Sequence, residues 1–451
     1  MEIGFYGAVG TVTGSKYLLK TAHHQFMVDC GLFQGMKELR SRNWKTLPFN
    51  PNSISAVILT HAHIDHSGYL PLLVKNGFSG KIYCSPATLD LCQILLPDSA
   101  HLQEEEALRA NRFGYSKHHP ALPLYTIEDA NRALEHFVAV PFGKEFSLTD
   151  DCHFRLQHAG HILGASTVRV EAELTSILFS GDVGRTHDMI MKPPTIIDPV
   201  DYLVLESTYG NRLHSEENPL DQMCEIVNRV SERGGVLLIP AFAVGRAQNV
   251  LYYLYTLKQK GLIPDLPIYL DSPMAISATE LFARYDNEHH LSHNLAKAVC
   301  ESATYVNTVE ESKALAKITT PMIIISASGM VEGGRVLHHL QNLASDPRNC
   351  ILLTGYQAAG TRGARLLAAE PRIKLFGQEI AIAAEVCELV NASAHADYAE
   401  IIEWLKKCPK APRKVFIAHG EKEAALAMQE HVMDELGWDA EIPTYGQLYT
   451  L

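Results

Sequence analysis

Residues 60–66 read Thr-His-Ala-His-Ile-Asp-His, and this segment decides both the fold and the chemistry expected of the chain. It follows the apolar, strand-length run 54–59 (Ile-Ser-Ala-Val-Ile-Leu) and precedes 67–72 (Ser-Gly-Tyr-Leu-Pro-Leu), which reads as a loop entering a helix. On this short turn His61 and His63 can point one way while Asp65 and His66 point another. That arrangement suits two metal ions held by nitrogen and oxygen ligands. A lone histidine is usually an ordinary surface or core residue, but this density of ligand types favours a metal site.

The bulk composition is that of an ordinary globular protein. The chain has 451 residues, enough for two or three domains, with 47% hydrophobic and 20% charged residues. Residues 1–7 have neither the basic start nor the apolar core of a signal peptide, and no apolar stretch reaches membrane-spanning length. The nine cysteines are scattered without a Cys-x-x-Cys pair, which argues against a disulfide framework or a cysteine zinc site. We therefore expect a cytoplasmic protein with no membrane partner.

The formal net charge is −12. A protein that coats duplex nucleic acid by electrostatics alone would usually be basic. Any nucleic-acid binding must therefore be local, in a cleft with its own positive lining. Carboxylate metal ligands would contribute part of the negative charge, and bound cations would offset it.

Two patterns of secondary structure alternate along the chain. Short strands are expected in residues 1–30, alternating strands and helices in 54–140 (with a polar helix over 99–113), and mainly strands from 146 to 208. After about residue 210 each apolar strand is followed by a helix, which indicates a parallel sheet with covering helices. From about 390 the first pattern resumes, so one domain is interrupted by another. The expected strand–helix pairs are 236–239 with 245–260, 268–270 with 277–285, 322–325 with 333–344, and 350–354 with 363–369.

Three further metal-ligand candidates stand at strand ends or turns. His161 lies in a turn before a strand, Asp182 follows the strand 177–180, and His419 follows the strand 414–417. A carboxylate beside Gly181, which allows close approach, is a good bridging ligand between two ions. Each candidate alone is as readily structural, but together with residues 60–66 they favour a two-metal site.

The order of these residues resembles a known family. Asp29, His61-x-His63-x-Asp65-His66, His161 and Asp182 resemble the metallo-β-lactamase fold, and Glu206, His395 and His419 resemble motifs A, B and C of its β-CASP branch. That branch comprises metal-dependent nucleases such as RNase J and the endonuclease subunit of the cleavage and polyadenylation machinery. The resemblance spans nearly the whole chain and is to a minimal bacterial or archaeal member, with neither a KH-type extension nor an extra C-terminal domain.

The resemblance implies an α/β fold, a metallo-β-lactamase αββα sandwich with an inserted β-CASP domain. The inserted domain would be a Rossmann-like α/β unit with a parallel sheet. We expect the first domain in residues 1–208, the β-CASP domain in 209–388, and a return to the first domain in 389–451.

The resemblance also implies a role for each site residue. One zinc ion would take His61, His63, His161 and Asp182, and the other Asp65, His66, Asp182 and His419, with a hydroxide between them as nucleophile. Mn²⁺ is an alternative metal. Asp65 is counted with the catalytic residues, and Asp29 would fix a ligand loop by hydrogen bonds. His395, held by Glu206, would act near the scissile phosphate as general acid or phosphate-binding group. His158 competes with His161 as ligand, but the family places the ligand just before the Leu-Gly turn, which favours His161.

Three glycine- and serine-rich loops of the second domain are candidates for gripping the substrate. They span 240–246, 326–330 and 360–363, and each opens toward a helix. Backbone N–H groups at helix starts, with arginines and hydroxyls, suit phosphates, although an ordinary strand-to-helix turn is the alternative for any one loop. These loops also resemble the RNA-binding loops of β-CASP nucleases. Arg335 and Arg365 are equally readable as solvated helix charges. The candidate binding residues are Arg246, Ser328, Gly329, Thr361 and Arg362.

We therefore predict a zinc-dependent ribonuclease with two Zn²⁺ per chain that cleaves single-stranded RNA, as an endonuclease, a 5′-exonuclease or both, in a cleft between the two domains. A DNA-processing β-CASP enzyme is the first alternative, but that branch usually has valine where this chain has His419. A small-molecule hydrolase, such as a thioesterase or lactonase, would not need so large an insert. A catalytically inactive RNA-binding subunit would have lost ligands, and all the expected ones are present. Base preference, metal in the cell and a homodimer are left open.

Overall fold

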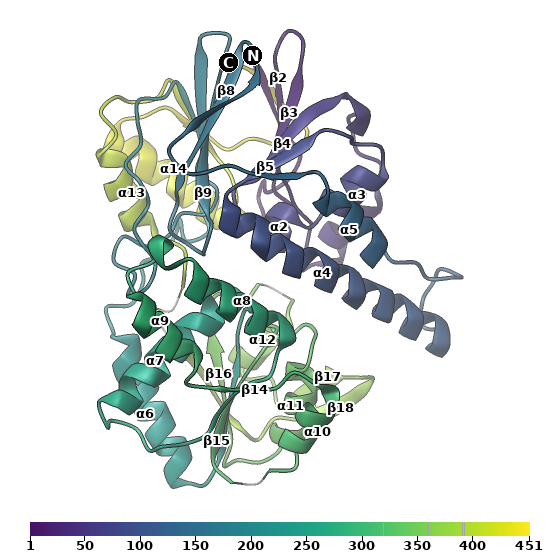
Figure 1. Ribbon diagram of the computed structural model, residues 1–451, viewed down its shortest axis with the longest axis vertical. Helices are drawn as coiled ribbons and strands as arrows, with labels where there is room; N and C mark the ends of the chain where they lie inside the picture. Colours follow the sequence, from purple (N-terminus) through teal and green to yellow (C-terminus); the bar gives the residue numbers. More distant parts are fainter. Residues whose placement is uncertain (319, 359, 390, 392) are drawn as a thin grey trace. The chain divides into compact units, whose positions relative to one another are not determined.

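The computed structural model describes residues 1–318, 320–358, 360–389, 391 and 393–451. Contacts divide the chain into two compact units, one formed by Met1–Leu213 with His395–Leu451 and the other by His214–Ala394. In Figure 1 the purple, blue and yellow segments make up the first unit, and the teal and green segments make up the second. The chain thus leaves the first unit and returns to it, while the domain limits expected from the sequence stay a prediction.

The first unit is built on two seven-stranded sheets that share one buried core. Phe5 and Phe26 of the first sheet lie in the same apolar cluster as Phe154, Phe179 and Phe416 of the second. Burying such side chains stabilises the fold by about 1.5–3 kcal/mol each, which fixes the two faces against each other. The first sheet has the order β22 (Leu448–Thr450), β1 (Glu2–Phe5), β2 (Lys16–Lys20), β3 (Gln25–Cys30), β4 (Ile54–Ile58), β5 (Lys81–Cys84) and β6 (Phe137–Ala139); the second has β21 (Ala440–Glu441), β20 (Lys414–Ile417), β11 (Tyr202–Leu205), β10 (Thr175–Phe179), β9 (Ser166–Ala172), β8 (Cys152–His158) and β7 (Glu145–Thr149).

Helices cover the outer faces of both sheets. Trp404 and Met428 pack with Leu203 and Val415 on the outer face of the second sheet. The helices near the first sheet include α4, the long blue helix of Figure 1. This is the αββα sandwich that the family resemblance implied. The helices are α1 (Lys37–Arg40), α2 (Ile64–Ser67), α3 (Leu70–Lys75), α4 (Pro86–Phe113) and α5 (Ile127–Leu134) in the first part of the chain, and α13 (Tyr398–Lys406) and α14 (Lys422–Leu436) in the returning part.

Parallel pairing explains why distant segments meet at one edge of each sheet. In the first sheet β3 and β4 run parallel, with Val28 opposite Ile58, so the residues that follow each strand emerge together. In the second sheet β10, β11 and β20 run parallel, with Phe179 opposite Val204 and Leu205 opposite Ile417. Asp29 is the next-to-last residue of β3, and the segments after the other strands carry residues 60–66, Asp182, Glu206 and His419.

The second unit contains a six-stranded parallel sheet, as the sequence predicted. Strand β12 (Val236–Pro240) is buried throughout, which is typical of a parallel strand covered on both faces. Separate apolar clusters lie on the two faces of the sheet. The sheet has the order β14 (Thr304–Tyr305), β13 (Ile268–Leu270), β15 (Met322–Ser326), β12, β16 (Cys350–Thr354) and β19 (Glu385–Leu389); the helices are α6 (Pro219–Glu232), α7 (Arg246–Gln259), α8 (Pro273–Arg284), α9 (His293–Cys300), α10 (Val309–Leu315), α11 (Val336–Leu343) and α12 (Arg362–Leu367), and β17 (Arg372–Leu375) pairs with β18 (Gln378–Ala381) in a hairpin.

One expected element is longer than the sequence indicated. The helix expected over 99–113 is only the second part of α4, which begins at Pro86 behind the N-cap Ser85 and continues through Pro97. Within the described ranges of the chain, no helix has both the length and the apolar composition required to cross a bilayer.

Candidate metal centre

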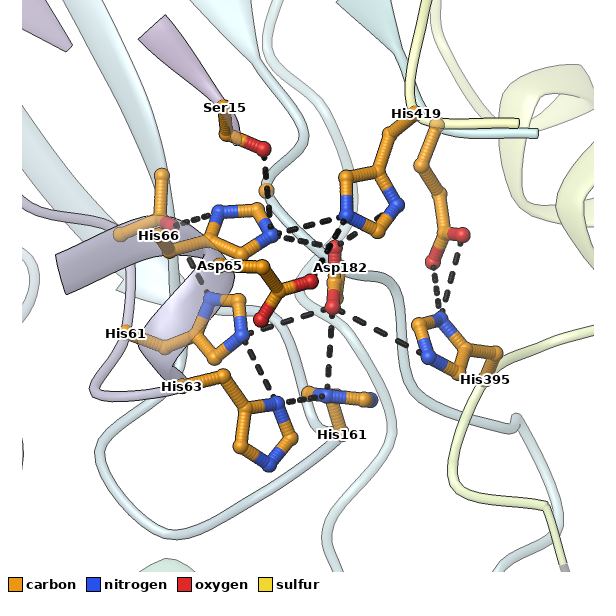
Figure 2. A network of polar contacts seen from close by, with 12 residues as sticks. Ser15, His61, His63, Asp65, His66, His161, Asp182, His395 and His419 are labelled. Carbon is orange, nitrogen blue, oxygen red and sulfur yellow. Dashed lines mark hydrogen bonds and ion pairs between the residues drawn. The ribbon is translucent and has the colours of Figure 1, made fainter. Parts of the chain in front are cut away.

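Seven potential ligands from four loops of the first unit converge beside its two sheets (Figure 2). The loop after β4 supplies a segment that turns directly into α2, so that its side chains spread around one point. The other three loops each supply a single ligand. The seven residues are His61, His63, Asp65 and His66 after β4, His161 after β8, Asp182 after β10, and His419 after β20.

The first group of donors has the dimensions of a tetrahedral metal site. His63 Nδ1 lies 3.1 Å from His61 Nε2 and 3.1 Å from His161 Nε2. Asp182 Oδ2 lies 3.4 Å from both Nε2 atoms. Zinc–nitrogen bonds of about 2.0–2.1 Å in a tetrahedron place the ligand atoms about 3.3 Å apart. The four measured separations lie close to that value.

The second group shares Asp182 with the first. Asp182 Oδ1 lies 3.2 Å from His66 Nε2, which in turn lies 3.0 Å from His419 Nε2. Asp65 Oδ2 completes the group at 3.5 Å from His419 Nε2. Because one carboxylate oxygen of Asp182 faces each group, this residue is placed to bridge two ions.

The chemistry of these donors fits divalent cations. Burial lowers the pKa of His61 to about 3 and that of His63 to about 4, and it holds the pKa of His161 well below its ordinary value, so all three rings are neutral and able to act as ligands. Asp182 Oδ1 is buried without a hydrogen-bond partner among the described residues. Several ring nitrogens and a buried carboxylate oxygen converge on the same space. A cation could bind all of these lone pairs at once, whereas a single proton could not.

Asp29 and Thr60 fix the orientation of two rings. Asp29 accepts hydrogen bonds from the Thr60 backbone N–H at 2.8 Å and from the Thr60 hydroxyl at 2.9 Å, and its Oδ2 lies 2.7 Å from His66 Nδ1. Thr60 Oγ1 also lies 3.0 Å from His61 Nδ1. With protons on both Nδ1 atoms, the Nε2 atoms are left free for metal. Asp29 therefore contacts the residue before His61 and the ring of His66, while its role stays a proposal, and Thr60, which was not among the predicted residues, joins the same contacts.

Two further hydroxyls beside the histidine rings were also missed. Thr208 Oγ1 lies 3.2 Å from His419 Nδ1, and Ser15 Oγ lies 3.4 Å from His66 Nε2. Thr208 follows the predicted Glu206 by two positions, so its neighbourhood was a usable signal. Ser15 is brought to the site by the pairing of β2 with β3 and gives no local signal.

His395 and Glu206 lie together at the side of the first donor group. His395 Nδ1 lies 3.1 and 3.2 Å from the two carboxylate oxygens of Glu206, and its Nε2 lies 3.9 Å from Asp182 Oδ2. Glu206 is held in turn by the Val183 N–H at 2.6 Å. Burial lowers the pKa of His395, but the carboxylates of Glu206 and Asp182 outweigh it and raise the pKa to about 9. His395 is therefore a cationic ring beside the donors.

His158 lies outside the donor groups. It is on β8 and stacks on Phe142 with the ring centroids 3.7 Å apart. His161, three residues later, is the histidine of this segment whose ring joins the cluster. The structure therefore places the two candidates as the family pattern favoured.

The candidate substrate residues lie at loop-to-helix junctions of the second unit. Arg246 is the first residue of α7, and Thr361 caps α12 by accepting a hydrogen bond from the Ala364 N–H at 3.2 Å. Ser328 Oγ accepts from the Glu332 N–H at 3.0 Å. Gly329 packs so tightly that a Cβ there would lie 2.6 Å from the Phe242 ring. Arg246, Ser328 and Thr361 already donate their backbone N–H groups to nearby carbonyls, and contact of these candidate residues with a substrate stays a prediction.

Arg362 is partly committed to its own unit. Its Nε donates to the Lys374 carbonyl at 3.1 Å, and its Nη1 donates to the Val331 carbonyl at 3.4 Å. Its Nη2 has no hydrogen-bond partner within the described ranges of the chain. The Arg362 side chain is thus held through Nε and Nη1, and its Nη2 could donate to a substrate. Of the two arginines left open, Arg335 is bound to Asp271 at 2.7 Å and Arg365 to Glu370 at 2.6 Å.

Three family profiles match successive parts of the chain. The profile of the metallo-beta-lactamase superfamily matches residues 9–213, the Beta-Casp domain matches residues 247–366, and the Zn-dependent metallo-hydrolase RNA specificity domain matches residues 379–443.

Individual relatives match over nearly the whole chain. Ribonuclease TTHA0252 of Thermus thermophilus is 36% identical over 95% of both chains, and an RNase J-like protein of Methanocaldococcus jannaschii is 31% identical over 98% of both. The transcription termination factor FttA of Methanosarcina mazei is 30% identical over 95% of this chain and 68% of its own length. Among solved structures, a protein of unknown function from Enterococcus faecalis V583 is similar in fold, with a TM-score of 0.54 and 13% identity over 100% of this chain and 99% of that one.

Proposed function

Because the chain belongs to the β-CASP family of the metallo-β-lactamase superfamily of metallo-hydrolases, we propose that it is a ribonuclease that hydrolyses phosphodiester bonds of single-stranded RNA. The observation that carries this proposal is the pair of donor groups sharing Asp182, with the cationic His395 beside them. The names of the relatives support RNA as the substrate, since those with the highest identity include a ribonuclease and an RNase J-like protein.

The two donor groups would each hold one metal ion. Two zinc ions, one in each donor group, would supply a Lewis acid and a hydroxide at neutral pH. The first would be held by His61, His63, His161 and Asp182, and the second by Asp65, His66, Asp182 and His419.

His395 would contact the scissile phosphate. The Nδ1–H group of His395 donates a hydrogen bond to Glu206, so Nε2 faces the space beside Asp182. From there Nε2 can donate a hydrogen bond or a proton to a phosphate or leaving-group oxygen. Glu206 touches His395 and no reacting atom, so it acts by orienting that ring.

The burial of the donors supports a single-stranded substrate. His61, His161, Asp182 and His419 are each no more than 3% exposed, whereas the side chain of His395 is 17% exposed. A phosphate can reach such a recessed site only if the backbone bends toward it. A single strand can bend and splay its bases, whereas an A-form duplex presents its phosphates on a stiff cylinder.

The test of this activity offers one hairpin with single-stranded flanks as RNA and as DNA of identical sequence. End-labelled RNA should be cut in the flanks and spared in the stem, with chelator abolishing cleavage and added zinc restoring it. Internal cuts or a ladder from the 5′ end would separate endonuclease from exonuclease action. Equal rates on the DNA version would assign the enzyme to DNA processing, and efficient cutting inside the stem would contradict the single-strand proposal.

The metal proposal is tested by elemental analysis of Asp182→Asn. The purified protein should carry close to two zinc ions, and this variant should lose most of both because each group depends on one of its oxygens. Asp151→Asn, in an exposed turn of the same unit, is the matched control and should keep both ions. Full metal content in Asp182→Asn would remove the bridging role.

A further inference from the structure

A second cluster of reactive side chains lies in the second unit, on strands β16 and β19. Parallel pairing sets Cys350 opposite Glu385 and Leu352 opposite Cys387. Cys350 and Cys387 belong to the same apolar cluster, so both thiols stand on one face of the sheet. Their sulfur atoms and a carboxylate oxygen of Glu385 all lie within 4.8 Å of one another. The two cysteines are scattered in sequence and meet only because these strands are neighbours.

Two arginines surround the carboxylate of this cluster. Arg229 Nη2 lies 2.7 Å from Glu385 Oε1 and 3.8 Å from Cys387 Sγ. Arg233 Nη2 lies 2.6 Å from Glu385 Oε2. Both oxygens of Glu385 are therefore ion-paired, and two guanidinium groups offset its charge. The Cys387 thiol donates to Glu385 Oε1 at 3.2 Å, so the two arginines offset the negative charge that this carboxylate places beside the thiol. The same guanidinium groups disfavour a divalent cation among these atoms.

The two thiols are unlike each other. Cys387 is half-buried, whereas Cys350 is fully buried. A hydrogen bond from the Cys350 thiol lowers the pKa of Cys387, and the same contact, together with burial, raises the pKa of Cys350. An accessible, more acidic thiol beside a buried partner is the arrangement of an attacking and a resolving cysteine.

We propose that Cys387 and Cys350 form a peroxide-sensitive dithiol that closes to an intramolecular disulfide. The Cys387 thiolate attacks hydrogen peroxide, an S–O bond forms as the O–O bond breaks, and the departing hydroxide takes up a proton to become water. The Cys350 sulfur, after losing its proton, attacks the Cys387 sulfenic acid; the S–S bond forms and the S–O bond breaks, releasing a second water. Two thiols are oxidised by two electrons, and one peroxide is reduced to two waters.

The position of β19 in the sheet makes this closure feasible. β19 is the edge strand of the six-stranded sheet and, among the residues that the structure describes, pairs with β16 alone, so it can shift toward Cys350 without breaking a second ladder. The two sulfur atoms lie within 4.8 Å of each other, and a shift of the edge strand brings them to bonding distance.

The experiment treats the reduced full-length protein with hydrogen peroxide and follows free thiols and peptide masses. Two of the nine thiols should disappear first, a linked Cys350–Cys387 peptide should form, and dithiothreitol should reverse both changes. Cys387→Ser should abolish this fast loss. Cys350→Ser should leave a sulfenic acid on Cys387 that dimedone traps. Cys224→Ser, which removes a half-buried single cysteine of the same unit, is the matched control and should behave as the wild type.

Three results would overturn the proposal. Oxidation of Cys387 to a sulfinic acid without the linked peptide would show that Cys350 does not resolve it. Oxidation of Cys224 or Cys408 as fast as Cys387 would show that the cluster confers no selectivity. A metal ion beyond the two of the first unit, present in the wild type and absent in Cys387→Ser, would make the cluster a metal site instead. Circular dichroism of each variant confirms that it is folded before these comparisons are made.

Discussion

Three side chains of the metal centre and its support stand on left-handed backbone. The φ angles are 57° at Asp29, 50° at His161 and 50° at His419. This conformation costs roughly 1–2 kcal/mol for a residue with a Cβ, so the neighbouring hydrogen bonds must hold it. The His419 N–H, for example, donates to the Ala8 carbonyl at 2.7 Å. The left-handed backbone at each of these residues directs its side chain toward the other residues of the site, and this helps the donors to converge.

The role of His395 gives a prediction at this scale. His395→Ala should keep its two metal ions yet lose about 10²–10⁴ in rate, the usual worth of a general acid or a transition-state contact. Elemental analysis and single-turnover cleavage of RNA measure the two quantities on one preparation. Loss of metal in step with activity would make His395 a ligand and would contradict its separation from His419.

Lys16 gives a second prediction at this scale, which concerns how the stability of the fold depends on pH. Its ammonium donates to the Gly14 carbonyl at 3.4 Å and lies over the rings of Phe33 and Tyr69, and burial lowers its pKa to about 8 from 10.5. Between these values the unfolded chain binds more protons than the folded one, so the folded state gains stability as pH rises from about 8 toward 10.5. The gain approaches about 1.4 kcal/mol per pH unit.

The free energy of unfolding of the wild type minus that of Lys16→Met should therefore increase from pH 7.5 to pH 9.5. Groups common to both proteins, including the nearby Tyr17 and Cys30, cancel in this difference to first order. Denaturant unfolding of the full chain measures it at each pH. A difference that stays constant would mean that Lys16 keeps its ordinary pKa when folded.

At the scale of elements, a close approach fixes the turn that carries two ligands. A Cβ on Gly31 would lie 1.6 Å from the Asp65 carbonyl oxygen, which also accepts from the Ser15 N–H at 2.9 Å. Gly31→Ala should therefore displace the start of α2, with Asp65 and His66, and should lower zinc from two ions toward one while His61 and His63 keep theirs. Gly333→Ala is the control, because a Cβ there meets nothing within 4 Å. Full zinc in Gly31→Ala would show that the turn adapts without moving its ligands.

The sequence predicted elements best where one local pattern governed them. Strands β13 and β16 lie where expected because apolar runs of strand length, bounded by turn residues, leave little choice. Helix α4 was underestimated because Pro97 lacks the N–H that the helix interior uses, so a local rule favours a helix only beyond it. The structure carries the helix through Pro97, with large buried side chains such as Leu91 and Leu95 before the proline and the buried residues Ala100, Ala107 and Ala110 after it.

For the candidate site, too, most residues with a local sequence signal were predicted, and those brought together only by the fold were missed. The seven proposed ligands could be named from residue types at strand ends and from the family resemblance, and the structure brings them together, although their roles stay proposals. Thr208, which contacts His419, was overlooked although it lies two positions after Glu206. Ser15 could not be named, because its contact with His66 depends on the pairing of two strands. The thiol pair was missed for the same reason: β16 and β19 are neighbours only in the folded sheet.

At the scale of the whole molecule, both ends of the chain are needed for the metal centre. β20, from the returning segment, lies between β11 and β21 in the second sheet and carries His419 at its end. The first unit therefore completes its donor groups only after the second unit has been traversed by the chain. No described residue of the second unit belongs to these groups, which leaves its loops available for the substrate contacts proposed for them.

A basic residue of those loops can be tested against a matched neighbour on the same helix. Arg362 and Arg365 both lie on α12, and both are ion-paired: Arg365 Nη2 lies 2.6 Å from Glu370, and Arg362 Nη1 lies 3.5 Å from Glu332. The Arg362 ion pair is the longer one, and Nη2 of Arg362 has no partner in the part of the chain that the structure describes. If Arg362 contacts a phosphate, Arg362→Gln should weaken binding of single-stranded RNA and lower the slope of log K against log salt by about 0.7, the value for one released counterion. Arg365→Gln should leave both unchanged.

The measurement is a fluorescence anisotropy titration at several salt concentrations, with a metal-depleted protein so that the RNA stays intact. Hydrolysis of a small activated phosphodiester by the metal-loaded variants should be spared, because the donor groups lie in the other unit. Arg246→Gln, at the start of α7, should behave as Arg362→Gln does. An unchanged salt slope in both variants would make these arginines structural, consistent with the carbonyl contacts that Arg362 already makes, and would move the search for the RNA-binding surface to other loops of the chain.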